Sequence, residues 1–357
     1  MTPTTYDIYL LRSDDRPLDH QGLLEVLQAL PLRRAVDDPS RYFYRNDDTG
    51  VYFQLLLSPE VVSNLQPPTS DEDADPEEES AINVDEAEEP EPETEDLEED
   101  DDEDGESFDI EMAPVTLTLP LVCPGFFGRE VVALAERLAQ AGNLSLGHPA
   151  HEEGSDARDG DGVTTTELVA SWNAANREAA NAVKEKGHLT VWSGKKAEAW
   201  WTYGTHRQAL EIELGDAGIY VPRLQVAFHG QQIKSLCSWD LTTPLVLPRT
   251  DLVLIRLQRQ RKGLLFNRRV TVEGFVSGET LWNLLAAFSE IRSEPVDLLI
   301  FRDADKPSPQ VAAELEVLSL EPLESAQRAE LTGTKLTGVG LTWMVDFELN
   351  STQEEGT

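Results

Sequence analysis

One stretch of this chain carries so much negative charge that it cannot form a packed structure on its own. Of the 36 residues from Asp71 to Glu106, 23 are Asp or Glu and none is Lys or Arg. Three prolines interrupt the stretch, and only three of its residues have large aliphatic side chains. So little apolar surface does not offset the entropy lost on ordering, and like charges repel one another. We therefore predict a disordered acidic insert at about 60–106.

The remainder of the chain has the composition of a folded protein. The 357 residues are 40% apolar with a net charge of −38, and leaving out 71–106 gives 44 acids and 29 bases on 321 residues, a net charge of −15. The acidity therefore belongs largely to one segment. No apolar run approaches the roughly 18 residues of a membrane-spanning helix, and no secretory signal is visible. We expect a soluble, cytoplasmic protein that makes no contact with a membrane.

Regular apolar spacing on both sides of the insert predicts a small α+β domain at 1–146. The expected elements are a strand at 6–11, a helix between its cap Asp19 and Pro31, a hairpin at 42–53, a strand at 108–122 and a helix at 127–142. The insert falls where two strands connect, so it is expected to leave the core of this domain intact.

A second break, 147–162, is rich in Gly, His, Asp and Glu and is interpreted as a linker or loop. It precedes a Trp-rich α+β domain at 163–350, and 351–357 is a tail. The first expected helix of this domain follows the capping box Thr164–Glu167, and further helices are expected at 195–214, 281–288 and 310–331. Ser277 is the candidate cap of the helix at 281–288. Strands are expected at 219–228, 233–239, 244–257, 296–301 and 339–349. The expected fold class is α+β: two domains of mainly antiparallel sheet with packed helices.

The second domain contains an unusual basic run. Six positive residues and no acid occur within fourteen positions: Arg256, Arg259, Arg261, Lys262, Arg268 and Arg269. If Lys262-Gly263 forms a hairpin turn, Arg256 lies opposite Arg269, an unfavourable pair unless an anion screens it. Three interpretations remain open: a solvated tip paired with nearby surface carboxylates, a tip that binds the acidic insert of its own chain, or a site for phosphate or nucleic acid to which Phe266 adds a stacking face.

Catalytic and metal-binding motifs are weak throughout. The sequence has no nucleophile elbow, zinc-protease motif or phosphate-binding loop. The carboxylates Asp240, Asp251 and Glu273 lie near expected strands and suggest a metal-dependent hydrolase as one alternative. His148 and His151 belong to a loop that we interpret as solvated, and Cys123 and Cys237 as reduced core thiols. We expect no cofactor and no bound metal.

Tryptophans are concentrated in the second domain. All seven lie there: Trp172, Trp192, Trp200, Trp201, Trp239, Trp282 and Trp343. Bulky aromatic residues at helical spacing are usually core, so we interpret Trp192, Trp200 and Trp201 as core rather than as a ligand platform.

A few short motifs support a resemblance. They are Tyr44-x-Asn46-x-x-Thr49-Gly50-Val51-Tyr52-Phe53, Pro124-x-Phe126-Phe127-Gly128, Val221-Pro222-Arg223 and Leu247-Pro248-Arg249-x-Asp251. In these motifs the chain resembles uncharacterised bacterial cytoplasmic proteins with no established activity, which implies a bacterial cytoplasmic origin. In type and composition it also looks like immunity proteins of bacterial toxin systems, which cover the active surface of a toxin.

These observations favour binding over catalysis. The leading hypothesis is an interaction protein, of immunity type, whose acidic segment steers a protein partner with a basic surface. The first alternative is a protein that binds nucleic acid or phosphate through the basic hairpin and is autoinhibited by the insert. The second is the metal-dependent hydrolase.

Overall fold

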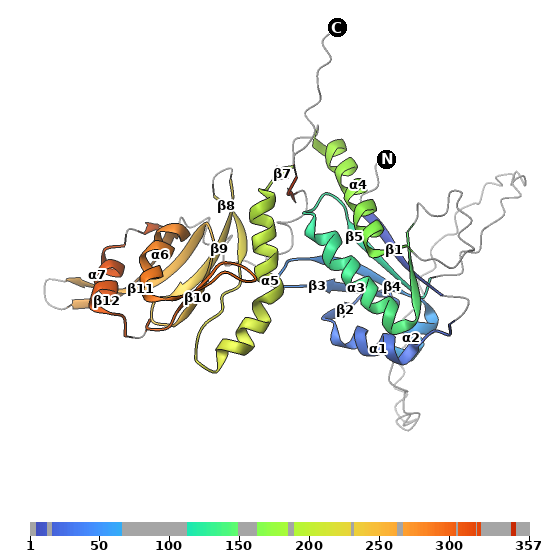
Figure 1. The fold of residues 1–357 in the computed structure, drawn as a ribbon, viewed down its shortest axis with the longest axis horizontal. Helices are drawn as coiled ribbons and strands as arrows, with labels where there is room; N and C mark the ends of the chain where they lie inside the picture. Colours follow the sequence, from blue (N-terminus) through green and yellow to red (C-terminus); the bar gives the residue numbers. More distant parts are fainter. Residues whose placement is uncertain are drawn as a thin grey trace, which may run out of the picture.

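A computed structural model describes ten segments of the chain, and the acidic segment 71–106 lies outside them. They are residues 5–12, 16–65, 113–148, 163–184, 189–229, 232–262, 267–304, 306–318, 320–322 and 344–347. The fold is α+β. In Figure 1 one sheet with its helices lies to the right, two further sheets lie to the left, and the long helix α5 (Gly194–Gly215) stands between them.

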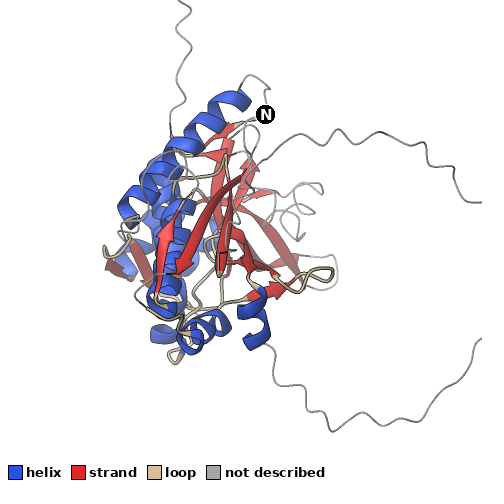
Figure 2. Cartoon of the chain, turned by 90° about the vertical axis from the view of Figure 1, so that its right-hand side faces the viewer, coloured by secondary structure: helices blue, strands red, loops and turns tan. Residues whose placement is uncertain are grey.

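The first sheet has six strands in the order β2-β3-β4-β5-β1-β6, each antiparallel to its neighbours. Its strands are β1 (Thr5–Arg12), β2 (Leu32–Arg34), β3 (Arg41–Arg45), β4 (Tyr52–Leu57), β5 (Val115–Pro120) and β6 (Leu144–Gly147). The accompanying helices are α1 (His20–Ala29), α2 (Pro59–Leu65), α3 (Phe126–Gly142) and α4 (Thr165–Lys184). Figure 2 shows the helices gathered on one side of the molecule and the strands on the other.

Local sequence signals explain these elements. Alternate residues of β4 and β5, such as Leu55 and Leu117, are fully buried and face one another in register. The side chain of Asp19 accepts a hydrogen bond from the backbone nitrogen of Gly22, which confirms the expected cap of α1. Helix α3 ends at Gly142, as expected, and the next residue, Asn143, adopts a left-handed conformation with φ of 56°.

Helix α4 packs on the first sheet's helix layer. Glu167 and Thr164 exchange hydrogen bonds, so the predicted capping box is confirmed. Further along α4, buried Asn176 accepts hydrogen bonds from the backbone nitrogens of Val122, at 2.6 Å, and Cys123, at 3.2 Å, and donates to the Cys123 carbonyl at 2.7 Å. Residues that follow the expected linker 147–162 therefore belong to the same buried cluster as the first sheet.

The remaining strands form a five-stranded sheet, a three-stranded sheet and a short parallel pair. The five-stranded sheet has the order β15-β12-β11-β9-β8, from β8 (Gln225–His229), β9 (Gln232–Asp240), β11 (Leu252–Lys262), β12 (Asn267–Ser277) and β15 (Glu321–Pro322). The three-stranded sheet has the order β10-β14-β13, from β10 (Leu245–Pro248), β13 (Glu290–Arg292) and β14 (Leu298–Phe301). The parallel pair is β7 (Thr190–Val191) with β16 (Met344–Val345), and the helices are α6 (Gly278–Leu285), α7 (Pro309–Val317) and a short 3-10 helix, Ala286–Phe288.

Three expected elements differ in extent. The single strand expected at 244–257 is two strands in different sheets, because the backbone nitrogen of Asp251 bonds to the Ser235 carbonyl and the chain changes sheet there. The helix expected at 310–331 ends at Val317 and is followed by β15, with 323–331 outside the described residues. Of the strand expected at 339–349, the described part contains β16 alone.

The insert expected at about 60–106 was placed too early, because residues 60–65 belong to helix α2, in which Val61 and Val62 are buried against the core. The rest of the expected insert lies outside the described residues. Ser277 does precede α6, but its side chain makes no capping hydrogen bond. None of the described helices combines the length and the apolar character needed to cross a membrane.

Candidate functional site

The basic hairpin has a different register from the one expected. Strands β11 and β12 pair from Leu252–Ser277 to Lys262–Asn267, so residues 263–266 connect them and lie outside the described part. Arg256 is therefore opposite Glu273, not Arg269, and its Nε donates a 2.8 Å hydrogen bond to the Glu273 carboxylate. The expected repulsion at Arg256 is absent because an acid occupies the opposite position.

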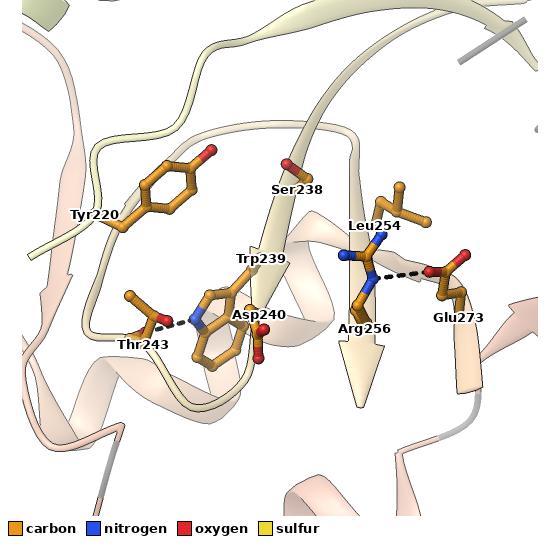
Figure 3. Close-up of a pocket in the computed structure, with 8 residues that line it drawn as sticks. All are labelled: Tyr220, Ser238, Trp239, Asp240, Thr243, Leu254, Arg256 and Glu273. Carbon is orange, nitrogen blue, oxygen red and sulfur yellow. Dashed lines mark hydrogen bonds and ion pairs between the residues drawn. The ribbon is translucent and has the colours of Figure 1, made fainter. Parts of the chain in front are cut away.

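Three of the predicted site residues line one cavity of about 290 Å³ on the five-stranded sheet. Asp240, Arg256 and Glu273 are register partners on β9, β11 and β12, with the guanidinium between the two carboxylates (Figure 3). The other lining residues are Tyr220, Ser238, Trp239, Thr243 and Leu254.

Most polar groups of this cavity already have a partner. The buried Trp239 ring donates its Nε1 hydrogen to the Thr243 carbonyl at 2.8 Å. Asp240 accepts hydrogen bonds from the backbone nitrogen and the hydroxyl of Thr242, at 3.3 and 3.1 Å. The two amino groups of Arg256 make no hydrogen bond or ion pair with the described residues. The cavity therefore offers a cationic hydrogen-bond donor flanked by two acids.

Asp251 lies away from this cavity. Its carboxylate accepts hydrogen bonds from the Ser235 backbone nitrogen at 3.0 Å and hydroxyl at 3.2 Å, and it forms an ion pair with Lys196 of α5. Burial raises the pKa of the Asp251 carboxyl, but the hydrogen bonds from Lys196 and Ser235 outweigh it and leave that pKa below its ordinary value. Because Ser235 precedes Asp240 by five residues on β9, the two acids are separated by roughly 16 Å along the strand.

The structure therefore does not bring the three candidate carboxylates together. Within the described ranges, no three His, Cys, Asp or Glu side chains are grouped so that they could hold a metal ion. A guanidinium between Asp240 and Glu273 also neutralises the charge that would attract a metal ion. His148 stacks on Tyr6 at 6.3 Å, while His151 lies outside the described residues.

Several interpretations of core residues are confirmed. Trp192 and Trp200 are buried and pack edge to face, whereas Trp201 is half-buried and hydrogen-bonded. Cys123 and Cys237 are both free and buried. Burial raises the pKa of the Cys237 thiol to about 12, so this thiol is not poised as a nucleophile.

A half-buried carboxylate that the sequence did not reveal, that of Glu130, lies between the 42–53 hairpin, α3 and α5. Glu130 accepts hydrogen bonds from Asn46 at 2.8 Å, Thr49 at 2.9 Å and Trp201 at 2.8 Å. Burial raises the pKa of Glu130, and these three donors offset only part of the effect. Asn46 and Thr49 are the polar residues of the Asn-x-x-Thr-Gly motif, so one signal for this junction was present in the sequence.

An ion-pair network lies beside this junction. Arg207 of α5, only 8% exposed, pairs with Asp48 of the hairpin turn and with Glu211, at 3.0 Å for the latter. Arg223 also pairs with Asp48, at 3.1 Å. Motifs far apart in the sequence therefore meet at one place, where they attach α5 to the first sheet.

A second recess, of about 560 Å³, lies on the first sheet and contains none of the predicted site residues. Phe43, Gln54 and Thr118 line it from adjacent strands, and they alternate with buried residues such as Leu55 and Leu117. Arg33 and Arg45 also line it. Phe43 of the 42–53 hairpin lines this recess and is 46% exposed. The sequence places this residue in the expected hairpin but indicates no role for it.

Comparison with known proteins adds no further assignment. No protein-family model, no curated protein and no solved structure matches this chain.

Proposed function

We propose that this chain is a non-catalytic bacterial protein of the cytoplasm, of immunity type, whose acidic segment 71–106 attracts a protein partner with a basic surface. The observation that carries the proposal is the charge itself: 23 acids and no base in 36 residues. A dense charge of one sign raises the rate at which an oppositely charged partner is encountered at low salt.

The fold is compatible with such a segment because it attaches between neighbouring strands. Leu57, at the end of β4, is the register partner of Val115 in β5, and the Ser58 backbone nitrogen bonds to the Pro114 carbonyl at 3.0 Å. The strands on either side are thus held together by their own pairing. Replacing the 47 residues 66–112 by about eight Gly and Ser residues shortens the loop and should stabilise the fold by roughly 1.5 kcal/mol.

The test compares the full chain with three variants. The first has the short Gly-Ser linker, the second carries Asn and Gln at all 23 acidic positions of 71–106, and the third has the same residues in permuted order. Each is used to capture partners from bacterial cytosol, and the association rate of the captured protein is then measured at low and high salt.

Electrostatic steering predicts a specific pattern among these variants. The linker and neutral variants should associate with the captured partner 10- to 1,000-fold more slowly at low salt, by the order of magnitude typical of steering, while the permuted variant should match the full chain. The difference should vanish at about 1 M salt, where the screening length is near 3 Å. An unchanged rate for the neutral variant would remove the acidic segment from the mechanism.

A further inference from the structure

The cavity on the five-stranded sheet contains a cation and an anion that do not pair with each other. Arg256 and Asp240 are register partners on the parallel strands β11 and β9, whose backbones lie about 4.8 Å apart. Arg256 nevertheless forms its ion pair with Glu273, and among the described residues no ion pair joins it to Asp240. Figure 3 shows the side chains of Arg256 and Asp240 lying apart in the cavity. Both charges are therefore available to a ligand.

Each charged group keeps polar atoms without a partner. The Arg256 guanidinium uses Nε alone, and its two amino groups contact no acceptor in the described part of the chain. Asp240 accepts both hydrogen bonds from Thr242 at Oδ1, so Oδ2 has no donor among the described residues. The hydroxyls of Tyr220 and Ser238 also make no hydrogen bond with the described residues. Arg256 is 64% exposed, so its amino groups are accessible from solution.

An apolar surface adjoins these charges. Leu254 lies two positions before Arg256 on β11 and therefore on the same face of the sheet. The rings of Tyr220 and Trp239 also line the cavity, and Figure 3 shows Tyr220 across it from Arg256. The cavity volume of about 290 Å³ is just below the range of about 300 to 1,000 Å³ that is usual for small-molecule sites. A ligand of amino-acid size fits this space better than a nucleotide or a larger cofactor does.

A simple ion of either sign fits the charge pattern poorly. An anion bound to Arg256 would lie near the carboxylates of Asp240 and Glu273, and a cation bound to Asp240 would lie near the guanidinium. A ligand that carries both charges close together avoids both repulsions. The end of a peptide chain carries only one of the two charges, whereas a free amino acid carries both on one carbon atom.

We propose that this cavity binds a free α-amino acid with an apolar side chain. The carboxylate of the ligand accepts hydrogen bonds from the two amino groups of Arg256, in the paired geometry that guanidinium and carboxylate groups favour. Its ammonium group donates to Oδ2 of Asp240, and its side chain packs on Leu254 and the Tyr220 ring. The proposal stands apart from the partner proposed for the acidic segment, because no described residue that lines the cavity belongs to 71–106.

The test measures the binding of matched small molecules to the full chain by isothermal titration calorimetry at low salt. L-leucine carries both charges, isocaproate is the same molecule without the ammonium group, and isopentylamine is the same molecule without the carboxylate. Both analogues are smaller than leucine, so size does not exclude them. L-phenylalanine serves as a second apolar amino acid.

Leucine or phenylalanine should bind with a dissociation constant of about 1 mM or tighter. Isocaproate and isopentylamine should each bind at least about tenfold more weakly than leucine, because each lacks one charge-assisted contact.

Two variants assign the contacts to residues. Asp240→Asn removes the partner of the ammonium group, and Arg256→Gln removes the partner of the carboxylate. The matched controls are Asp297→Asn and Arg302→Gln, which change exposed members of ion pairs outside the cavity. Circular dichroism and thermal unfolding verify that all four variants fold.

The selectivity of the variants distinguishes direct contact from a structural role. Asp240→Asn should abolish the advantage of leucine over isocaproate, and Arg256→Gln should abolish its advantage over isopentylamine. A residue that only supported the fold would weaken all the ligands alike. The controls should change each dissociation constant by less than about threefold, since distant sites act independently.

Four outcomes would overturn the proposal. Neither leucine nor phenylalanine binds, or isocaproate binds as tightly as leucine, which would indicate a site for plain carboxylates. Isopentylamine binds as tightly as leucine, which would indicate a site for amines. In the fourth, the folded Asp240→Asn and Arg256→Gln variants bind leucine as the full chain does, which would place the binding elsewhere in the molecule.

Discussion

Replacing Gly128 by alanine should destabilise the protein through a single contact between α3 and α4. A Cβ atom at this position would lie 2.4 Å from Cε3 and 2.7 Å from Cδ2 of Trp172. Trp172 is completely buried, so its ring has no solvent to move into. Carbon atoms pack at about 3.5 to 4.0 Å, which means that the ring or one of the two helices must retreat by about 1 Å or more.

The size of the effect follows from two opposing contributions. Overpacking of a filled core destabilises by about 1 to 3 kcal/mol, whereas alanine is favoured over glycine inside a helix by about 1 kcal/mol. The net loss in the free energy of unfolding should therefore be at most about 2 kcal/mol. Gly215, the last residue of α5, is the matched control, because a Cβ there meets nothing within 4 Å. Gly215→Ala should leave stability unchanged or raise it by up to about 1 kcal/mol.

Urea unfolding followed by circular dichroism measures both variants. A double-mutant cycle with Trp172→Leu isolates the contact, because the leucine side chain leaves room for the new methyl group. In that background Gly128→Ala should behave like Gly215→Ala, with a coupling energy of about 1 to 3 kcal/mol between positions 128 and 172. If Gly128→Ala alone matches Gly215→Ala in sign and size, the close packing of α4 on α3 is refuted.

Three more substitutions test the polar contacts by urea unfolding. Burial raises the folded-state pKa of Glu130 above its ordinary value of 4.5, so the contribution of this carboxyl to stability falls as the pH rises from that value. The penalty of Glu130→Gln should therefore shrink between about pH 5 and pH 7, and a constant penalty would contradict this. The folded-state pKa of Asp251 lies below its ordinary value of 3.8. The stability that this carboxylate provides is therefore fully present above about pH 4 and is lost as the pH falls through the folded-state pKa. The penalty of Asp251→Asn should accordingly grow from about pH 3 to pH 6. Arg207→Met should cost about 3 kcal/mol, because it removes the buried partner of the largely buried Asp48 carboxylate and leaves only the exposed Arg223 beside it. Arg223→Met, at a 54% exposed position, should cost less than about 1 kcal/mol, and equal losses would refute the assignment.

Elements with strong local periodicity could be predicted from the sequence. The apolar face of α3 requires only neighbouring residues to be recognised, and this helix appears close to its expected bounds. The hairpin expected at 42–53 is present as well, but its second strand, β4, continues to Leu57. The caps of α1 and α4 were also predictable, because the capping side chain and its partner lie within three residues.

The hairpin register could not be fixed in the same way. The expected pairing of Arg256 with Arg269 and the observed pairing with Glu273 differ by four residues. An even shift leaves every side chain on the same face, so the alternation of apolar residues does not distinguish the two registers. The Lys262-Gly263 pair was a local turn signal, but the strands remain paired up to Lys262 and Asn267. The cavity lined by Asp240, Arg256 and Glu273 could not be predicted from the sequence, because these residues become neighbours only in the observed register.

Long-range burial was equally invisible in the sequence. Glu130 occurs in an amphipathic helix where a solvated glutamate is the ordinary expectation, and its partial burial depends on contacts from the 42–53 hairpin and from α5. Likewise, the break at Pro248 to Asp251 interrupts an apolar run that periodicity alone interprets as one strand. Such features need the tertiary structure because their partners are distant in the sequence.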